Sequence, residues 1–135
     1  MGETVSIELF ESKHRQWSKF RKSHRYEIRK AQARGVRVYQ DTRWEKFNDF
    51  VSLYAATMER VRAAKHYCHT LDHFVQLRSA LGDRLRLFVA EYNGAACCAS
   101  LFVHTCFIVQ YHLSGSNPIG RKLAASKLIV NEARP

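Results

Sequence analysis

The residues from Ile108 to Lys122, IVQYHLSGSNPIGRK, have the composition of an anion-binding turn. An apolar stretch runs into small and polar residues, and then into a sequence typical of a helix start. The small and polar residues are Ser114, Gly115, Ser116, Asn117 and Gly120. The first amides of a helix have no partner within the helix, and the helix dipole favours negative charge at that end. We therefore predict that the backbone N–H groups of this loop hold an anion, with Arg121 and Lys122 adding positive charge.

Tyr111 and His112, at the end of the same apolar stretch, are the candidate catalytic side chains. An imidazole has an ordinary pKa of about 6.5, so it can exchange a proton near neutral pH. An exposed structural histidine at a strand end is the alternative for His112, and both readings stay open. The acids Asp72 and Glu91 stand alone in the sequence, so no mechanism with paired carboxylates is predicted.

Histidine and cysteine also cluster in the segment HYCHTLDH, where His69 and His73 are four residues apart. This spacing places two imidazoles on one helix face, as in many zinc sites. No glutamate lies between them and no second ligand pair occurs elsewhere, so a metal-binding regulator is the weakest hypothesis and no metal site is predicted.

The cysteines stand at positions 68, 97, 98 and 106 and form no C-x-x-C pair. This pattern is typical of reduced, buried thiols and not of a disulfide framework. Neighbouring residues of a strand point to opposite faces of a sheet, so we expect Cys97 and Cys98 to do the same.

The net charge of +10 is concentrated near the N-terminus. From Lys13 to Arg37 there are ten lysines and arginines against one acid, Glu27. Such a concentrated field favours an anionic partner, for example tRNA or another nucleic acid. A basic but merely solvated helix face is the alternative.

Several elements are expected to position these residues. A first strand lies within TVSIELF, and one or two amphipathic helices follow between Glu11 and Gly35. VRVYQD alternates as a short strand. A long helix with Asp41 or Thr42 as its N-cap follows, because apolar residues recur every three or four positions: Trp44, Phe47, Val51, Tyr54, Met58 and Val61. We expect this stripe to be core.

The second half of the chain predicts an antiparallel meander. A helix capped by Thr70 and closed by Gly82 precedes three apolar, β-rich runs: RLRLFVAEY, AACCASLFVHT and FIVQYHLSG. Asn93-Gly94 joins the first two runs and is a strong hairpin signal. The middle run is apolar on consecutive residues, so both of its faces should be covered. GRKLAASKLIVNEA then predicts one terminal helix.

The length and composition, 135 residues and 46% hydrophobic, suit one α+β domain spanning residues 1–135. No stretch reaches the roughly 20 apolar residues of a membrane span, and the N-terminus has no signal-peptide pattern. We therefore expect a soluble, cytoplasmic protein without a membrane span.

Four blocks of sequence, in order, resemble the FemAB-like branch of the GNAT acyltransferase superfamily. They are KSHRYEIRKAQARGVRV, FVSLYAATMERVRAAKHY, LFVAEYNGAACCASLFV and YHLSGSNPIGRKLAASKLIVNEA. The resemblance implies a GNAT-like fold: a three-stranded meander with short N-terminal strands, packed with amphipathic helices. It further implies transfer of an acyl group from acyl-CoA or aminoacyl-tRNA to an amine by direct attack. No covalently bound cofactor is expected, and acyl-CoA would be a co-substrate.

By this resemblance, Tyr111 to Ser114 would bind the donor's arm and the loop Gly115 to Lys122 its pyrophosphate. Arg60 and Tyr67 would line the acceptor side. The usual pyrophosphate signature of that superfamily is not found around Gly120, which weakens the assignment to CoA.

The family domain continues beyond the last helix, whereas this chain ends at Pro135, so we expect a C-terminally truncated form. The strand from 107 to 113 would then be a long apolar edge, which predicts a homodimer formed by edge pairing or by swapping of the terminal helix. The alternative function is a catalytically inactive, basic, oligomeric nucleic-acid-binding module.

Overall fold

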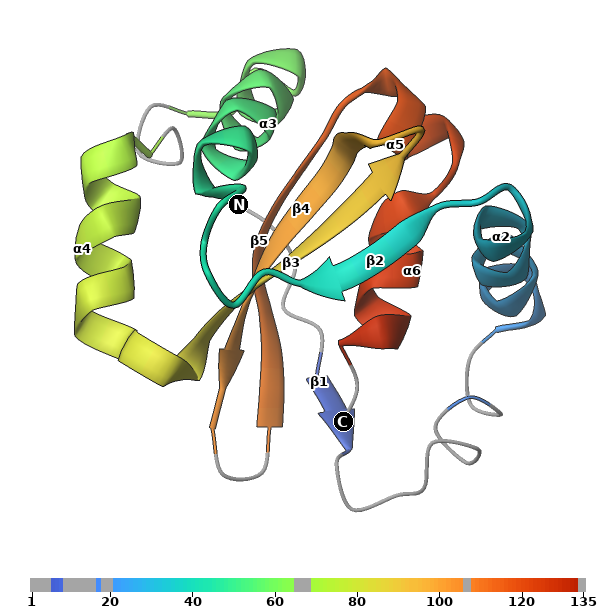
Figure 1. Ribbon diagram of the computed structural model, residues 1–135, viewed down its shortest axis with the longest axis horizontal. Helices are drawn as coiled ribbons and strands as arrows, with labels where there is room; N and C mark the ends of the chain where they lie inside the picture. Colours follow the sequence, from blue (N-terminus) through green and yellow to red (C-terminus); the bar gives the residue numbers. More distant parts are fainter. Residues whose placement is uncertain (1–5, 9–16, 18–20, 65–68, 106–107, 134–135) are drawn as a thin grey trace.

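A five-stranded antiparallel sheet with helices on both faces organises the chain (Figure 1). The computed structural model describes residues 6–8, 17, 21–64, 69–105 and 108–133. The strand order is β1-β5-β4-β3-β2. The strands are β1 (Ser6–Glu8), β2 (Arg37–Gln40), β3 (Leu85–Tyr92), β4 (Ala95–His104) and β5 (Ile108–Ser116). The helices are α2 (Lys22–Ala33), α3 (Phe47–Arg60), α4 (Leu71–Leu81), the short 3-10 helix η2 (Gly82–Arg84), α5 (Pro118–Lys122) and α6 (Ala125–Glu132).

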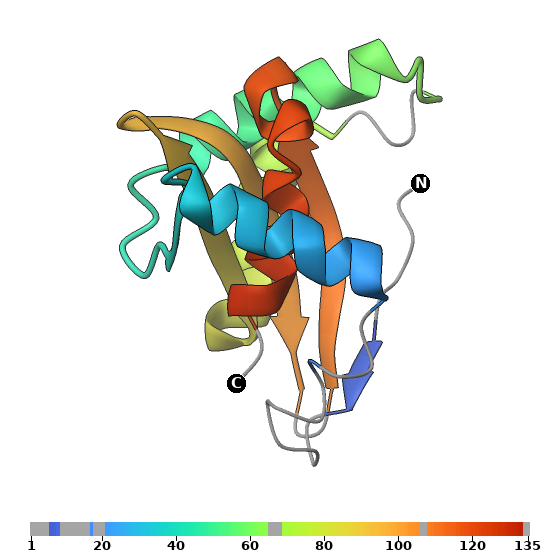
Figure 2. The ribbon, with the colours of Figure 1, turned by 90° about the vertical axis from the view of Figure 1, so that its right-hand side faces the viewer.

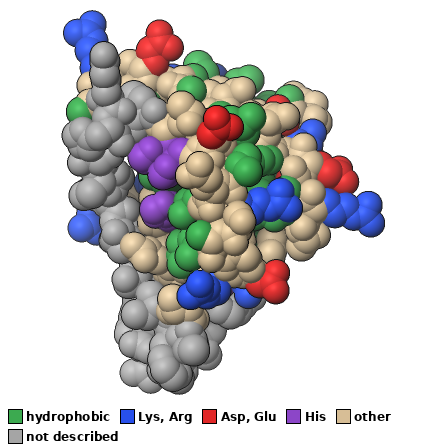
Figure 3. Space-filling model, turned by 90° about the vertical axis from the view of Figure 1, so that its left-hand side faces the viewer, with side chains coloured by type: hydrophobic (Ala, Val, Ile, Leu, Met, Phe, Trp, Pro, Cys, Tyr) green, Lys and Arg blue, Asp and Glu red, His purple; other side chains and the backbone are tan. Residues whose placement is uncertain are grey.

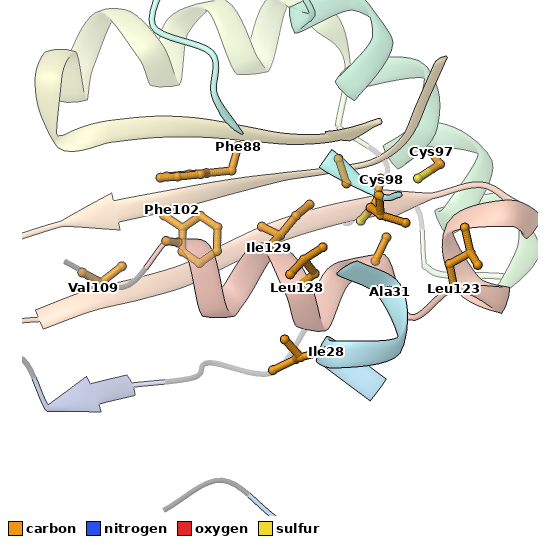
Figure 4. Close-up of a cluster of buried hydrophobic side chains, with 14 residues drawn as sticks. Ile28, Ala31, Phe88, Cys97, Cys98, Phe102, Val109, Leu123, Leu128 and Ile129 are labelled. Atoms are coloured by element: carbon orange, nitrogen blue, oxygen red, sulfur yellow. The ribbon is translucent and has the colours of Figure 1, made fainter. Parts of the chain in front are cut away.

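Two layers of helices bury the sheet, as the apolar middle run predicts. Helices α3 and α4 cover one face, and α6 with α2 laid across it covers the other (Figures 1 and 2). The six residues 97–102 of β4 are all buried. Figure 4 shows the cluster on the α6 side, to which α2 contributes Ile28, α6 contributes Leu128 and β4 contributes Phe102. The predicted α+β class and the meander are confirmed.

The local signals at the helix and hairpin ends are largely confirmed. Asn93 and Gly94 both adopt positive φ, 54° and 81°, as a tight hairpin between β3 and β4 requires. The Thr70 side chain accepts a hydrogen bond from the His73 amide and caps α4. Asp41 does not cap α3 itself. Its carboxylate accepts hydrogen bonds from the backbone amides of Glu45 and Lys46. Helix α3 begins at Phe47, about one turn later than expected.

The terminal helix is in fact two helices, which corrects the prediction of one. Ala124 adopts the left-handed conformation (φ 53°), so α5 ends at Lys122 and α6 begins at Ala125. The break lets α5 lie at the end of β4 and β5, while α6 runs along the sheet (Figure 1).

Two irregularities interrupt the ladder of strands. Between β3 and β4 the register passes from Ala90↔Cys98 to Glu91↔Ala96, which leaves Cys97 without a Cα partner. This bulge puts Cys97 and Cys98 in the same core cluster, so the expectation that they face opposite ways is wrong (Figure 4). Between β4 and β5 the register passes from Leu101↔Leu113 to Phe102↔Tyr111, and His112 is the extra residue.

The N-terminal strand covers part of the edge that was expected to be free. β1 pairs with β5 at Ile108, Val109 and Gln110. The premise of a long uncovered edge is therefore wrong for this segment, and it holds only for residues 111–116 of the described structure. The homodimer stays a prediction. Within the described residues, none of the helices combines the length and apolarity needed to cross a membrane.

Candidate functional site

A pocket of about 260 Å³ opens between the C-terminal half of α3 and the outer edge of β5. From β5 it is lined by Tyr111, His112, Leu113 and Ser114, and from α3 and the following turn by Tyr54, Thr57, Met58, Val61 and Ala63. Most of these groups are apolar, with a few polar groups from β5 and Thr57. A small apolar cleft with few polar groups is the usual form of a site for an uncharged ligand moiety.

The bulge at His112 lies within this pocket. Because His112 has no Cα partner on β4, the peptide groups around it fall out of the regular ladder. Bulges next to sites re-aim backbone and side-chain groups in this way. The irregular part of β5 and the pocket thus coincide at His112.

His112 lies in a partly buried, histidine-rich environment. Burial lowers its pKa, and the neighbouring His73 lowers it further. His73 stacks on His69 with ring centroids 4.0 Å apart, and His69 in turn stacks on Tyr54 of the pocket. Histidine side chains gather on this face next to α4 (Figure 3). At neutral pH the His112 imidazole is therefore uncharged and able to accept a proton.

Tyr111 is held more deeply than His112. Its ring packs edge-on against Phe102 with centroids 5.3 Å apart. Burial raises the pKa of its phenol, so the hydroxyl stays protonated at neutral pH. Tyr111 can therefore donate a hydrogen bond but is no base.

Ser114 belongs to a small buried polar cluster on the α6 side of the sheet. The Ser100 hydroxyl donates to the Ser114 Oγ at 2.8 Å, and the Cys98 Sγ lies 3.7 Å from the same atom. Burial raises the pKa of the Cys98 thiol to about 11. Cys97 and Cys98 are free and buried, as predicted, whereas Cys68 and Cys106 lie outside the described residues.

The turn that follows β5 does not present free amides to one point, which corrects the predicted anion seat. The Ser116 amide donates to Thr57 Oγ1 at 3.0 Å, and the Asn117 amide donates to the Cys97 carbonyl at 3.0 Å. The Gly120 amide donates to the Asn117 side chain at 2.9 Å. One helix cap and two tertiary hydrogen bonds thus satisfy these groups within the protein.

The glycines of this turn serve close packing. A Cβ at Gly115 would overlap the backbone of Tyr54 in α3, and a Cβ at Gly120 would overlap the carbonyl of Cys97 in the β4 bulge. The small residues therefore let α3 and α5 approach the sheet. The roles of Ser114, Gly115, Ser116, Asn117 and Gly120 in binding a donor are not shown by this geometry.

Comparison with known proteins places the chain in a family. A sequence profile of the FemAB family matches residues 5–101. The chain belongs to the FemAB family. Its fold is similar to that in the structure titled "Crystal structure of FemX", with a TM-score of 0.80 and 12% sequence identity. That match covers 96% of this chain and 48% of the FemX chain, so this chain spans about half of FemX. No curated protein sequence matches it.

The remaining predicted residues of this FemAB-family chain are dispersed. Arg121 is exposed, and its Nη1 donates to the Ser116 carbonyl at 3.3 Å. Lys122 is also exposed and lines a different groove, described below. Arg60 is exposed in the last turn of α3, near the pocket but not among its lining residues. Tyr67 lies outside the described residues.

The α3 wall of the pocket includes Tyr54, Met58 and Val61, which belong to the apolar stripe predicted to be core. Phe47 and Tyr54 of the predicted stripe are buried, whereas Met58 is half-buried and Val61 is 50% exposed. The sequence contained a sign of this exposure, because the apolar stripe continues to Val61, just beyond the last residue of α3. Thr57 lies off the stripe, and no sequence feature marked it.

Proposed function

We propose that this chain binds the donor end of aminoacyl-tRNA and transfers its aminoacyl group to an amine. The observation that carries the proposal is the pocket beside the His112 bulge, at the open edge of β5. Membership of the FemAB family supports the transferase class, and the likeness to FemX supports the same scaffold.

The reaction is a direct displacement at an ester carbonyl. The acceptor amine forms an amide bond to the carbonyl carbon, and the bond to the ribose oxygen of the tRNA breaks. The amine loses a proton, and the ribose oxygen gains one as it leaves. Negative charge builds on the carbonyl oxygen in the transition state, so a fixed donor near that oxygen accelerates the reaction.

The residues of the pocket match these needs. The peptide groups displaced from the ladder at the bulge are the candidate donors to the carbonyl oxygen. The uncharged His112 imidazole would accept the proton of the amine, since its lowered pKa keeps it unprotonated at pH 7. Once protonated, the same imidazole would pass that proton to the leaving ribose oxygen. The Tyr111 ring packs against Phe102 in the cluster on the α6 side of the sheet, so its phenol has no role in this step. The apolar wall of α3 would hold the aminoacyl side chain.

The closed turn favours aminoacyl-tRNA over acyl-CoA as the donor. In the CoA alternative, the amides of Ser116, Asn117 and Gly120 would bind a pyrophosphate, but they already have partners within the protein. An aminoacyl ester needs only the strand edge and the pocket.

A matched pair of valine variants tests the proposal. Val61 lines the pocket and is 50% exposed, whereas Val75 of α4 is 49% exposed and does not line it. Val61→Phe should narrow the pocket and lower kcat/KM for aminoacyl-tRNA by at least about tenfold. Val75→Phe should leave it unchanged. Equal effects of the two variants would contradict the assignment of the pocket.

The role of His112 has its own test. His112→Gln should lower the transfer rate by about 10²-fold or more, because a general base is lost. In the unsubstituted protein the rate should stay level as the pH falls from neutral through about 6.5, the ordinary histidine value, and decline only below it. A rate of His112→Gln equal to that of the parent would remove His112 from the mechanism.

A further inference from the structure

A second groove lies between α2 and the junction of α5 and α6, away from the β5 pocket. Two adjoining cavities, of about 290 and 320 Å³, share Arg34, Lys122 and Leu123 as lining residues. Helix α2 forms one wall, and the α5–α6 junction and the end of β3 form the other. Figure 2 shows α2 crossing in front of α6 on this side of the molecule.

The groove is positively charged. Lys30, Arg34 and Lys122 line it and are exposed. The one acid among its lining residues, Glu27, is neutralised by Lys127 at 2.9 Å. On the opposite side, around α4, acidic and basic side chains are interspersed (Figure 3). The charge excess predicted from Lys13 to Arg37 thus includes one wall of a groove, although Lys13, Arg15 and Lys19 lie outside the described residues.

An exposed aromatic ring and an exposed aliphatic side chain also line the groove. Tyr26 is 64% exposed, and the Lys30 Nζ lies 5.9 Å from the centre of its ring. Ile119 is 49% exposed at the other end, next to Tyr92. Cations that follow a groove beside an exposed aromatic ring match the phosphates and unstacked bases of a single strand. A duplex hides its base faces, so it could use the charges but not the ring.

We infer that this groove binds single-stranded nucleic acid, with phosphates on Arg34 and Lys122 and a base stacked on Tyr26. The inference does not depend on the transfer reaction, because none of these residues lines the β5 pocket. The pocket lies beside α3 and the groove beside α2 and the α5–α6 junction, and these helices cover opposite faces of the sheet.

A charge-matched pair of double variants tests the phosphate contacts. The probe is a single-stranded RNA of about ten nucleotides, titrated at several salt concentrations and followed by fluorescence anisotropy. Arg34→Gln/Lys122→Gln should weaken binding and lower the slope of log K against log salt by about 1.4, since each lost contact removes about 0.7. Arg43→Gln/Arg84→Gln removes the same charge from exposed positions outside the groove and should leave the slope within about 0.3 of the parent.

A tyrosine pair tests the stacking contact separately. Tyr26→Ala should weaken binding of the single strand about tenfold or more without changing the salt slope, and Tyr26→Phe should bind as the parent does. Circular dichroism of each variant checks that it is folded. Equal losses in the two double variants, equal binding of duplex and single strand, or binding to anionic lipid vesicles without binding to RNA would each overturn the inference. Each of these outcomes leaves the result of the Val61→Phe test unaffected, so the two proposals can fail separately.

Discussion

Two neighbouring segments, Tyr111–Ser114 of β5 and the turn Gly115–Gly120, differ in whether they border a cavity or are closed by hydrogen bonds within the protein. The first contains the His112 bulge and lines a pocket, in the part of β5 that β1 does not pair with. In the second, the amides of Ser116, Asn117 and Gly120 are bonded within the protein. Only the second segment has the small-residue composition usually taken as a sign of anion binding.

The difference shows that a run of small residues has two physical meanings. Glycine admits a ligand close to the backbone, but it equally admits another part of the protein. At Gly115 and Gly120 the neighbours are Tyr54 and Cys97. The pocket that we propose for the aminoacyl group lies a few residues earlier in the chain, where β5 has its bulge.

The largest effect is expected from adding a methyl group to the turn. Gly120→Ala should lower the free energy of unfolding by at least about 3 kcal/mol, since the new Cβ overlaps the Cys97 carbonyl and the backbone has to move. Gly115→Ala should behave similarly against Tyr54. Urea denaturation of the purified variants measures both.

Gly35 provides the control for these substitutions. It has a φ of +90° but open space around its Cα, so Gly35→Asn should cost only about 1 kcal/mol. If Gly120→Ala cost no more than Gly35→Asn, close packing would not explain the small residues of the turn.

A smaller effect is expected from the hydroxyl that closes the turn. Thr57 Oγ1 accepts the Ser116 amide at 3.0 Å and donates to the Leu53 carbonyl at 2.8 Å. Thr57→Val keeps the side-chain shape but leaves the Ser116 amide and the Leu53 carbonyl without this partner. The free energy of unfolding, measured by urea denaturation, should fall by about 1–3 kcal/mol. Thr57→Ser keeps the hydroxyl and should retain most of the stability. A fully stable Thr57→Val would mean that the Ser116 amide is available to a ligand after all.

Removing the helix cap of the same turn should have a comparable or smaller effect. Asn117→Ala deprives the Gly120 amide of its acceptor and should lower the free energy of unfolding by about 1 kcal/mol. Asn117→Asp keeps an acceptor and should be close to neutral. Thermal unfolding followed by circular dichroism resolves the two, and identical melting temperatures for all three proteins would show that the cap is not formed.

The last effect is confined to acidic pH and concerns the other histidine of the β4–β5 hairpin, His104. Burial lowers its pKa to about 4, and its Nε2 has no hydrogen-bond partner among the described residues. The unfolded chain protonates near 6.5, so the unfolded state binds more protons between these values, and stability falls as the pH drops from about 6.5 to 4. His104→Leu should flatten that part of the pH–stability curve. An unchanged curve would show that His104 titrates normally.

The parts of the fold that local chemistry decides were predictable from sequence. The Asn93-Gly94 turn, the Thr70 cap and the buried run of β4 follow from propensities of a few neighbouring residues. The break at Ala124 was not predictable, because alanine favours a helix and only tertiary packing forces it into the left-handed region.

The candidate site was predictable only in part, for a related reason. Tyr111, His112 and Ser114 do line one pocket. The bulges at Cys97 and His112 are properties of strand pairing, which a single strand's sequence does not contain. The first bulge leaves the Cys97 carbonyl to accept the Asn117 amide of the turn, and the second places His112 at the pocket.

The most direct test is a titration of nitrogen-labelled protein with an amide-linked aminoacyl-adenosine, a stable mimic of the tRNA terminus, followed by NMR. We predict that the amide signals of His112, Leu113 and Ser114 shift on binding while those of Ser116, Asn117 and Gly120 stay in place. Shifts confined to Ser116, Asn117 and Gly120, with His112 to Ser114 unchanged, would contradict it.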